Sequence, residues 1–216
     1  MSARTVLFVH GLESGPRGKK ARTLEAAGFR VVSAQMPCGR SAILRDPVVV
    51  GLLCAALAIL VVGMRAGLRG LGLALGALVV AQYFVRAALM RRVFRRSVDV
   101  QLALLARESV DVVMGSSFGG AVVLELLARG AWRGQTLLLC PAHRLVASRA
   151  WRPVPTLPAD ASRVTVVHGS RDETVPLADS RALVAGTAAK FVEVDDDHRL
   201  SVTATAENFR EWLQPL

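Results

Sequence analysis

The sequence predicts an α/β protein with a mostly parallel sheet, helices on both faces and an inserted two-helix membrane hairpin. In both arms of the chain, short apolar runs alternate with stretches of helical periodicity, as in parallel sheets that are covered on both faces. Between the arms lie two long uncharged segments that approach the length of a bilayer span. We therefore expect one α/β domain in two parts, 1–42 and 97–216, with the hairpin at 43–96.

The strands are expected where short apolar runs end at turn residues. Gly28 closes the helix of the first arm, because glycine tolerates a left-handed backbone, and Gly130 closes a helix of the second arm in the same way. A sheet of this kind places its functional site beyond the carboxyl ends of its strands. The expected strands are 5–9, 30–34, 111–115, 136–140, 163–167 and 190–194, and the expected helices are 18–27, 98–108 and 118–129.

Two apolar segments predict the hairpin. Residues 47–64 are eighteen residues without a charge, and a helix of that length is about 27 Å long, enough to cross a bilayer core. Residues 71–85 are also uncharged, and this span extends to 90 if Arg86 reaches toward the headgroups. A loop at 65–70 separates the two spans. The alternative is a hydrophobic hairpin that is buried as a lid or as a contact between copies of the chain.

Residues at the ends of the spans predict how the hairpin packs and points. The G-x-x-x-G pairs Gly63/Gly67 and Gly72/Gly76 would let the two helices approach closely. Arginines are concentrated outside the hairpin, so the positive-inside rule places both arms in the cytoplasm. The outer arginines are Arg40, Arg45, Arg86, Arg91, Arg92, Arg95 and Arg96, and those of the loop are Arg65 and Arg69. We expect a cell-membrane protein with two spans and no signal peptide at the start of the sequence.

The composition excludes an intrinsically disordered chain, because 52% of the residues are hydrophobic and only 20% are charged. The formal net charge of +10 indicates an anionic partner, either nucleic acid or a lipid surface. We do not expect nucleic-acid binding, because it needs stacking aromatic side chains and only 5% of the residues are aromatic. The three scattered cysteines, Cys38, Cys54 and Cys140, predict free thiols in a reducing compartment.

The segment GSSFG, residues 115–119, fits the G-x-S-x-G pattern of a nucleophilic serine. It lies where an expected strand meets an expected helix. The sharp turn there leaves no room for side chains two residues before and after the nucleophile. This spacing assigns Ser117 as the nucleophile, because Ser116 lacks the flanking glycines. The alternative is that Ser117 only caps the helix.

Asp172 and His198 each follow an expected strand, at the sheet edge that carries Ser117. We expect His198 to accept the Ser117 proton and to deliver it later to the leaving group, while Asp172 holds the imidazole in the right tautomer. The alternatives are that Asp172 caps a helix start at Thr174 and that His198 is an exposed loop residue. Residues 195–197 are three aspartates, which we expect in a solvated turn, although one of them could replace Asp172 as the acid.

Two backbone amides are expected to form the oxyanion hole that stabilises a tetrahedral intermediate. They belong to Phe118, the residue after the nucleophile, and to Leu12, in the turn after the first strand. His10 and His168 each precede a glycine at a strand end and are predicted to be packed structural residues. His143 is expected to line the site without an assigned role.

Five segments together resemble a known family. They are VLFVHGLESGPRGKKA (6–21), GSSFGG (115–120), LLCPA (138–142), HGSRDETVP (168–176) and DDH (196–198). These segments and the order Ser…Asp…His resemble the α/β-hydrolase superfamily, and within it small, nearly capless bacterial serine esterases. The resemblance implies an α/β-hydrolase-like sheet and a serine hydrolase acting on an ester, thioester or similar acyl bond. The chain departs from this pattern in its hairpin and in the short proline-bearing loop, with Pro153, Pro155 and Pro158, at the usual cap site.

The sequence therefore predicts a membrane-anchored serine hydrolase that faces the cytoplasm and cleaves carboxylic esters through an acyl-enzyme. Its expected partners are a small-molecule or lipid acyl-ester substrate and membrane lipids, and no cofactor or metal is expected. Because the chain enters the hairpin through Met36 and Pro37, at the edge that carries Ser117, the site should open toward lipid. Two alternatives are an acyl-thioesterase or acyltransferase that uses the same triad, and a catalytically inactive, membrane-tethered binding protein.

Overall fold

The computed structural model describes residues 3–12, 14–39 and 45–214 and confirms the predicted fold class. Six parallel strands form one sheet in the order β2-β1-β3-β4-β5-β6. The strands are β1 (Thr5–Val9), β2 (Arg30–Val32), β3 (Val112–Ser116), β4 (Gln135–Leu139), β5 (Val164–Gly169) and β6 (Lys190–Val194). Val6 of β1 pairs with Val112 of β3, so the two arms of the chain meet inside the sheet.

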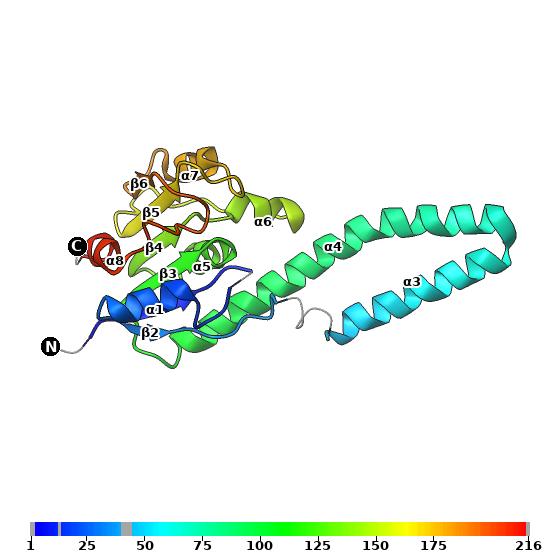
Figure 1. The fold of residues 1–216 in the computed structure, drawn as a ribbon, viewed down its shortest axis with the longest axis horizontal. Helices are drawn as coiled ribbons and strands as arrows, with labels where there is room; N and C mark the ends of the chain where they lie inside the picture. The colour runs from blue at the N-terminus through cyan, green and yellow to red at the C-terminus, as the bar shows by residue number, and fades with distance from the viewer. Residues whose placement is uncertain (1–2, 13, 40–44, 215–216) are drawn as a thin grey trace.

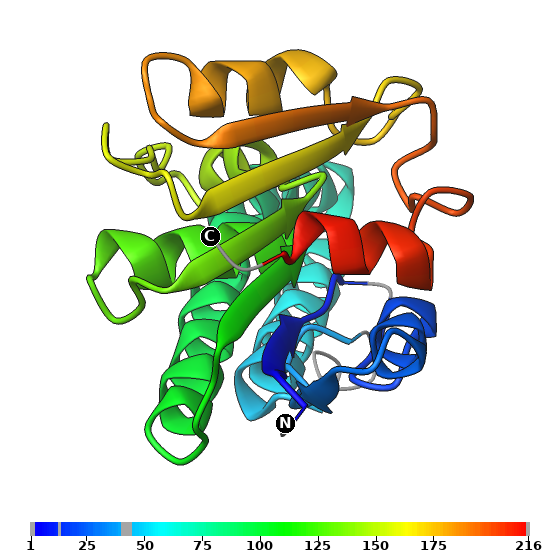
Figure 2. The ribbon, with the colours of Figure 1, turned by 90° about the vertical axis from the view of Figure 1, so that its left-hand side faces the viewer.

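Helices cover both faces of the sheet (Figure 2). Alternate strand residues face opposite ways, so Leu7 and Val113 pack toward α4 and α5, whereas Val6 and Met114 pack toward α1 and α8. The helices of the α/β domain are α1 (Lys19–Ala26), α5 (Phe118–Ala128), α6 (His143–Arg149), α7 (Leu177–Val184) and α8 (Ala206–Trp212), and the C-terminal part of α4 (Gly67–Leu105) joins them.

Helices α6, α7 and α8 have no counterpart among the expected helices. Each of these helices has at most eight residues, too few for a clear helical repeat. The region after β4, expected to be only a short proline-bearing loop, begins with α6, and Pro153, Pro155 and Pro158 follow that helix.

The predicted hairpin is formed by α3 (Pro47–Arg65) and the N-terminal part of α4, which run side by side away from the sheet (Figure 1). Both helices are long and apolar enough to cross a membrane. Their most apolar 18-residue stretches have mean hydropathies of 2.7 in α3 and 1.8 in α4. Only 11% of each of these stretches is buried inside the protein. The structure therefore does not support the alternative of a lid that is buried on the α/β domain.

The turn of the hairpin is tighter than expected. Ala66 alone separates the two helices, and Gly67, with a φ of +76°, begins α4. The loop predicted at 65–70 is wrong, because a left-handed glycine reverses the chain within one residue and residues 67–70 are already helical.

Helix α4 does not end at the predicted limit of the second span at residue 90, nor at the expected domain boundary at 96. It continues for 39 residues to Leu105. Phe94 and Val98 of the same helix are buried in the core against the sheet. The arginines near residue 90 mark a change of surroundings and not a helix end, because arginine is a good helix former.

Small residues bring α3 and α4 together, but of the four glycines expected to do so only Gly63 takes part. A Cβ on Gly63 would lie 2.6 Å from the Ala74 Cβ and 3.0 Å from the Gly70 carbonyl oxygen. Nothing lies within 4 Å of a Cβ at Gly67, Gly72 or Gly76. The close contact is thus made by Gly63 with Gly70 and Ala74, because the tight turn shifts the pairing of the helices from that expected for a longer loop.

Asp46 closes the base of the hairpin. Its carboxylate caps α3 by accepting a hydrogen bond from the Val48 N–H at 2.9 Å. The other oxygen lies 3.2 Å from Arg92 Nε and 2.6 Å from Arg96 Nη1 of α4. This cap and the two ion pairs hold the beginning of α3 against α4, where α4 enters the α/β domain.

The substitution Gly63→Leu should destabilise the hairpin, because its side chain would force α3 and α4 apart at Ala74 and Gly70. We expect the melting temperature of the detergent-solubilised protein to fall by roughly 2–10 °C. Gly72→Leu is the matched control, since a Cβ there meets open space. Equal melting temperatures for the two variants would contradict the helix contact at Gly63.

Candidate active site

Ser117 occupies a strained turn between β3 and α5. Its φ of 56° and ψ of −116° lie outside the regions that non-glycine residues usually adopt. A Cβ on Gly115 would lie 2.7 Å from the Gly119 carbonyl oxygen, and one on Gly119 would overlap the Val9 carbonyl oxygen. Both flanking glycines are therefore required, as the G-x-S-x-G pattern predicts. Ser117 is the residue before α5, but its side chain makes no capping hydrogen bond, so the alternative of a simple helix cap is not seen.

The structure brings Ser117, His198 and Asp172 together in one hydrogen-bonded series. His198 Nε2 lies 2.9 Å from Ser117 Oγ, and His198 Nδ1 lies 2.6 Å from Asp172 Oδ2. Asp172 follows β5 and His198 follows β6, so both reach Ser117 from the carboxyl edge of the sheet. With Nδ1–H donating to the carboxylate, Nε2 is free to accept the Ser117 hydroxyl proton.

Asp172 also has the capping role that was considered as its alternative. Its Oδ1 accepts hydrogen bonds from the Thr174 and Val175 N–H groups, both at 2.8 Å. Burial opposes ionisation of this carboxyl, but hydrogen bonds from His168, His198 and Val175 outweigh it and hold the Asp172 pKa well below its usual range. One oxygen therefore fixes the loop while the other orients His198, and the carboxylate stays ionised.

The two expected oxyanion amides lie beside Ser117. Phe118 directly follows Ser117, and a Cβ on Gly11, which precedes Leu12, would lie 3.4 Å from the Ser117 Cβ. Within the described parts of the chain, neither the Leu12 N–H nor the Phe118 N–H donates a hydrogen bond. Both donors are therefore available for an oxygen bound next to Ser117.

Neither a protein-family model nor a curated protein matches this chain. A proposed hydrolase of the alpha/beta superfamily from Xanthomonas campestris pv. campestris superposes with a TM-score of 0.60, 20% identity and coverage of 99% of both chains. Est1E from Butyrivibrio proteoclasticus, with ferulic acid bound, gives a TM-score of 0.61 and 14% identity over 98% of this chain and 88% of its own. A proposed hydrolase from Agrobacterium vitis S4 superposes with a TM-score of 0.57 and 15% identity. The match covers 98% of this chain and 88% of that protein. The chain has the α/β-hydrolase fold.

His168, predicted to be only a packed residue, also contacts the acid of this α/β-hydrolase site. It is fully buried, and its Nδ1 lies 2.7 Å from Ser180 Oγ. Its Nε2 lies 3.0 Å from the Val175 carbonyl oxygen and 3.2 Å from Asp172 Oδ2. Because both neighbours of Nε2 are acceptors, Nε2 carries a proton. His168 thus donates to the Asp172 carboxylate, a role that its spacing four residues before Asp172 could have indicated.

The expectation that residues 195–197 form a solvated turn is wrong for Asp196, which is 2% exposed. Its Oδ2 accepts hydrogen bonds from the Val202 N–H at 3.0 Å and from the Thr203 N–H at 2.7 Å, and its Oδ1 accepts one from the Asp197 N–H. Asp196 therefore shapes the loop that presents His198. It does not take the place of Asp172 beside His198, because Asp172 occupies His198 Nδ1.

His10 and His143 hold turns of the α/β-hydrolase fold near the site. His10 is buried, its Nδ1 lies 2.8 Å from the Gly11 carbonyl oxygen, and its Nε2 accepts from the Met36 N–H at 3.4 Å. His143 is 2% exposed, with Nδ1 3.0 Å from the Pro141 carbonyl oxygen, so it packs under the site and does not line an open surface. Burial lowers the pKa of both imidazoles, which favours their neutral forms.

Cys140, Asp172 and His198 each place one possible metal ligand within 4.8 Å of the others. They do not fit a metal site, because both nitrogens of His198 are already engaged by Ser117 and Asp172. Burial also raises the pKa of Cys140 to about 12, which disfavours the thiolate that a metal requires. All three cysteines are unpaired thiols, with Cys38 and Cys140 buried and Cys54 exposed on α3.

The Asp196 carboxylate should stabilise the fold. Asp196→Ala leaves the Val202 and Thr203 N–H groups without an acceptor and should lower the free energy of unfolding by about 3 kcal/mol. Asp195→Ala is the control and should change it little, because the Asp195 side chain is 83% exposed. Urea unfolding of the detergent-solubilised protein measures both. A loss for Asp195→Ala as large as that for Asp196→Ala would contradict this assignment.

The contribution of the Asp196 carboxylate to the free energy of unfolding should depend on pH. Burial raises the pKa of Asp196, but hydrogen bonds from Thr203, Asp197 and Val202 outweigh it and lower the pKa to about 2. The pKa of Asp196 is therefore lower in the folded protein than in the unfolded chain, where it is about 3.9. The Asp196 carboxylate stabilises the fold fully at pH values above the unfolded pKa, and this stabilisation is lost as the pH falls toward about 2.

Proposed function

We propose that this protein is a membrane-anchored serine hydrolase that cleaves carboxylic ester bonds, with lipid-like acyl esters as its substrates. The observation that carries the proposal is the hydrogen-bonded series from Ser117 through His198 to Asp172, with Ser117 at a positive φ. A helix cap or a surface histidine does not require this combination of strain and hydrogen bonding. The α/β-hydrolase fold adds support by placing the series at the carboxyl edge of the sheet.

In the proposed reaction, His198 Nε2 takes the Ser117 hydroxyl proton as Oγ attacks the ester carbonyl carbon. The carbonyl oxygen becomes negative and accepts hydrogen bonds from the Leu12 and Phe118 N–H groups. His198 then protonates the leaving alcohol, and the acyl group stays on Ser117. A water molecule next gives a proton to His198 and attacks this acyl-enzyme. The carboxylic acid leaves as the proton returns to Ser117.

One neighbour of the fold agrees with an acyl substrate, and another agrees with hydrolase chemistry. Est1E holds ferulic acid, which belongs to the carboxylic acids that an ester hydrolase releases as products. The protein from Xanthomonas campestris pv. campestris is also a proposed hydrolase of the alpha/beta superfamily. At 14% and 20% identity these neighbours share the fold with this chain, so the proposed chemistry rests on the chain's own triad.

The exposed surface of the hairpin supports membrane anchoring. Leu68 and Leu73 are 89% and 77% exposed, and most large side chains along both helices are apolar and accessible. Water disfavours an apolar patch of this size, whereas a bilayer accommodates it. Because arginines are concentrated at the domain end of the hairpin, the positive-inside rule supports a catalytic domain that faces the cytoplasm at the cell membrane.

The segment that follows α6 lies against the base of the hairpin. Arg91 of α4 donates from Nε to the Ala150 carbonyl oxygen at 2.5 Å. The rings of Phe84 on α4 and Trp151 meet edge to face, with centroids 5.3 Å apart. Helix α6 begins directly after β4, at the sheet edge that carries Ser117, and the segment at its other end rests on α4 next to the proposed lipid surface. This placement favours substrates that partition into the bilayer. A high local concentration of such a substrate in the bilayer makes tight binding of the substrate by the enzyme unnecessary.

Ser117→Ala should abolish both labelling by a fluorophosphonate probe and hydrolysis of a water-soluble ester, because Ser117 forms the covalent intermediate. His198→Ala should remove essentially all hydrolysis, and Asp172→Asn should leave more residual activity, because Asp172 only orients the base. Ser116→Ala is the matched control and should label like the parent. Equal labelling of the parent and Ser117→Ala would refute the nucleophile. Labelling without turnover of any ester would favour a thioesterase, an acyltransferase or an inactive binding protein.

Replacing residues 47–86 by a short Gly/Ser linker should separate anchoring from catalysis. The linker can be short because Asp46 lies against Arg92 and Arg96. We expect hydrolysis of a water-soluble short-chain ester to persist, while hydrolysis of a long-chain ester embedded in vesicles falls by at least roughly tenfold. The Ser117→Ala form of each protein gives the background rate. If the two proteins hydrolyse both esters in the same ratio, the hairpin is only a tether.

A further inference from the structure

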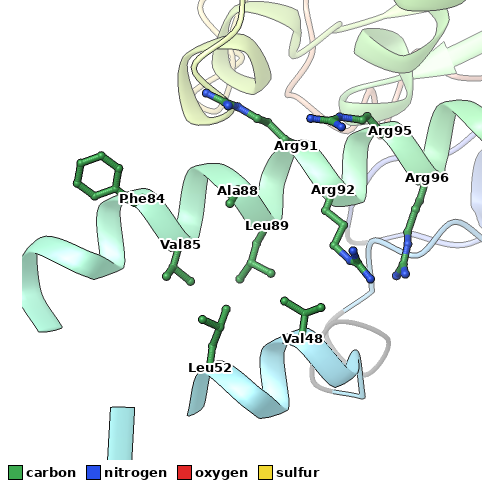
Figure 3. A pocket seen from close by; sticks show the side chains of 10 residues that line it. All are labelled: Val48, Leu52, Phe84, Val85, Ala88, Leu89, Arg91, Arg92, Arg95 and Arg96. Carbon is green, nitrogen blue, oxygen red and sulfur yellow. The ribbon is translucent and has the colours of Figure 1, made fainter. Parts of the chain in front are cut away.

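A groove of about 700 Å³ runs along the base of the hairpin, between α3 and α4. Its two ends differ in chemistry (Figure 3). At the end near the α/β domain it is lined by four arginines of α4, namely Arg91, Arg92, Arg95 and Arg96, and its lining contains no carboxylate. Toward the hairpin turn the lining is entirely apolar. The catalytic series does not line this groove, which is therefore a separate feature of the molecule.

The apolar end is built from both helices. Val85 and Leu89 of α4 point toward Val48 and Leu52 of α3 (Figure 3). Phe84 completes this end on α4. From Phe84 to Arg96 the helix rises about 18 Å, so a single extended molecule can contact both ends of the groove.

The arginine end carries more positive charge than the protein neutralises. Asp46, the nearest carboxylate that pairs with these side chains, serves both Arg92 and Arg96. Arg91 donates only to the backbone carbonyl oxygens of Ala150 and Trp151. Arg95 is exposed and makes no hydrogen bond or ion pair with any residue in the described ranges. Asp46 therefore neutralises at most one of four positive charges and pairs with two of the four guanidinium groups, so an added anion would find unsatisfied N–H donors here.

We propose that this groove binds an anionic phospholipid, with the headgroup phosphate at the arginines and an acyl chain along Val85 and Leu89. The inference rests on the proposed membrane anchoring, because it needs the hairpin to lie in a bilayer. The groove is charged at one end and apolar at the other, as a phospholipid is. Its charged end lies at the domain end of the hairpin, which is where lipid headgroups lie when the hairpin is inserted in a bilayer.

A second copy of the chain is a poorer occupant. Two copies anchored in the same membrane point the same way, so a symmetric pairing through this face would place the four arginines opposite four further arginines, and like charges at close range repel. A zwitterionic lipid fits the apolar end but leaves the excess positive charge without a counterion. The charge of the groove therefore selects an anionic lipid.

The first test measures lipid selectivity without turnover. The full-length protein in a neutral detergent is mixed with equal amounts of phosphatidylglycerol and phosphatidylcholine with the same acyl chains, and bound lipid is counted by native mass spectrometry. We expect phosphatidylglycerol to be retained about tenfold more than phosphatidylcholine. The double variant Arg92→Gln/Arg95→Gln should lose most of this preference, while Arg96 still pairs with Asp46. Equal retention of both lipids by the parent, or a lipid-free dimer, overturns the proposal.

A matched control removes the same charge elsewhere on the hairpin. Arg65→Gln/Arg69→Gln takes two positive charges from the hairpin turn and should leave the preference unchanged. An equal loss in this control would show general attraction of anionic lipid to a basic protein and would overturn the groove as a specific site.

The apolar end is tested with all charges in place. Val85→Trp fills that end and should reduce phosphatidylglycerol retention at least threefold, whereas Val79→Trp, at an exposed position of α4 outside the groove, should not. Unchanged retention in Val85→Trp overturns the acyl-chain contact and with it the proposed site.

Ser117→Ala should bind phosphatidylglycerol like the parent, and Arg92→Gln/Arg95→Gln should still hydrolyse a water-soluble ester. Failure of the lipid site and failure of the proposed hydrolase are thus distinguishable.

Discussion

The arrangement of the site depends on backbone segments that approach one another more closely than side chains allow. Gly119 lies against the Val9 carbonyl of β1, Gly120 would place a Cβ 2.8 Å from the Pro141 Cβ after β4, and Gly169 of β5 meets the Asp196 carbonyl after β6. These contacts draw the ends of several strands to one point. Ser117 remains at a positive φ because the surrounding backbone leaves it no other position.

Ser117 is also coupled to the hairpin, through the single helix α4. The rings of Phe94 and Phe118 meet edge to face with centroids 6.1 Å apart, so α4 supports the residue that follows Ser117. Arg152 lies 4.8 Å from the centroid of the Phe94 ring and pairs with Glu125 of α5 at 3.0 Å. The same helix thus presents an apolar surface at one end and forms part of the hydrolase core at the other, which a hairpin attached by flexible loops would not do.

The sequence predicts what depends on local pattern. The buried strands appear as apolar runs, and Ser117 is identified by glycines that the turn requires at fixed spacing. Asp172 and His198 follow from the order of strand ends. Other features depend on contacts that are distant in sequence. Asp196 looks solvated within a run of aspartates, because the amides that bury its charge come from a turn at residues 202–203. The full length of α4 is also not visible in the sequence. The arginines near residue 90 mark a boundary between apolar and polar surroundings, but they do not interrupt the hydrogen bonds of the helix.

The pairing of Val6 with Val112 has a consequence for how the chain folds. The central strands of the sheet are separated by the whole hairpin, so β3 can join β1 only after both hairpin helices have been synthesised. Closing such a long loop costs conformational entropy. Once α3 and α4 have paired, however, the 2.6 Å contact between Asp46 and Arg96 brings the two ends of the insertion together. The effective loop then consists of the short connections on either side of the hairpin. For the folding sheet, an insertion of this length therefore behaves like a short connection, which explains how an α/β domain tolerates it between neighbouring strands.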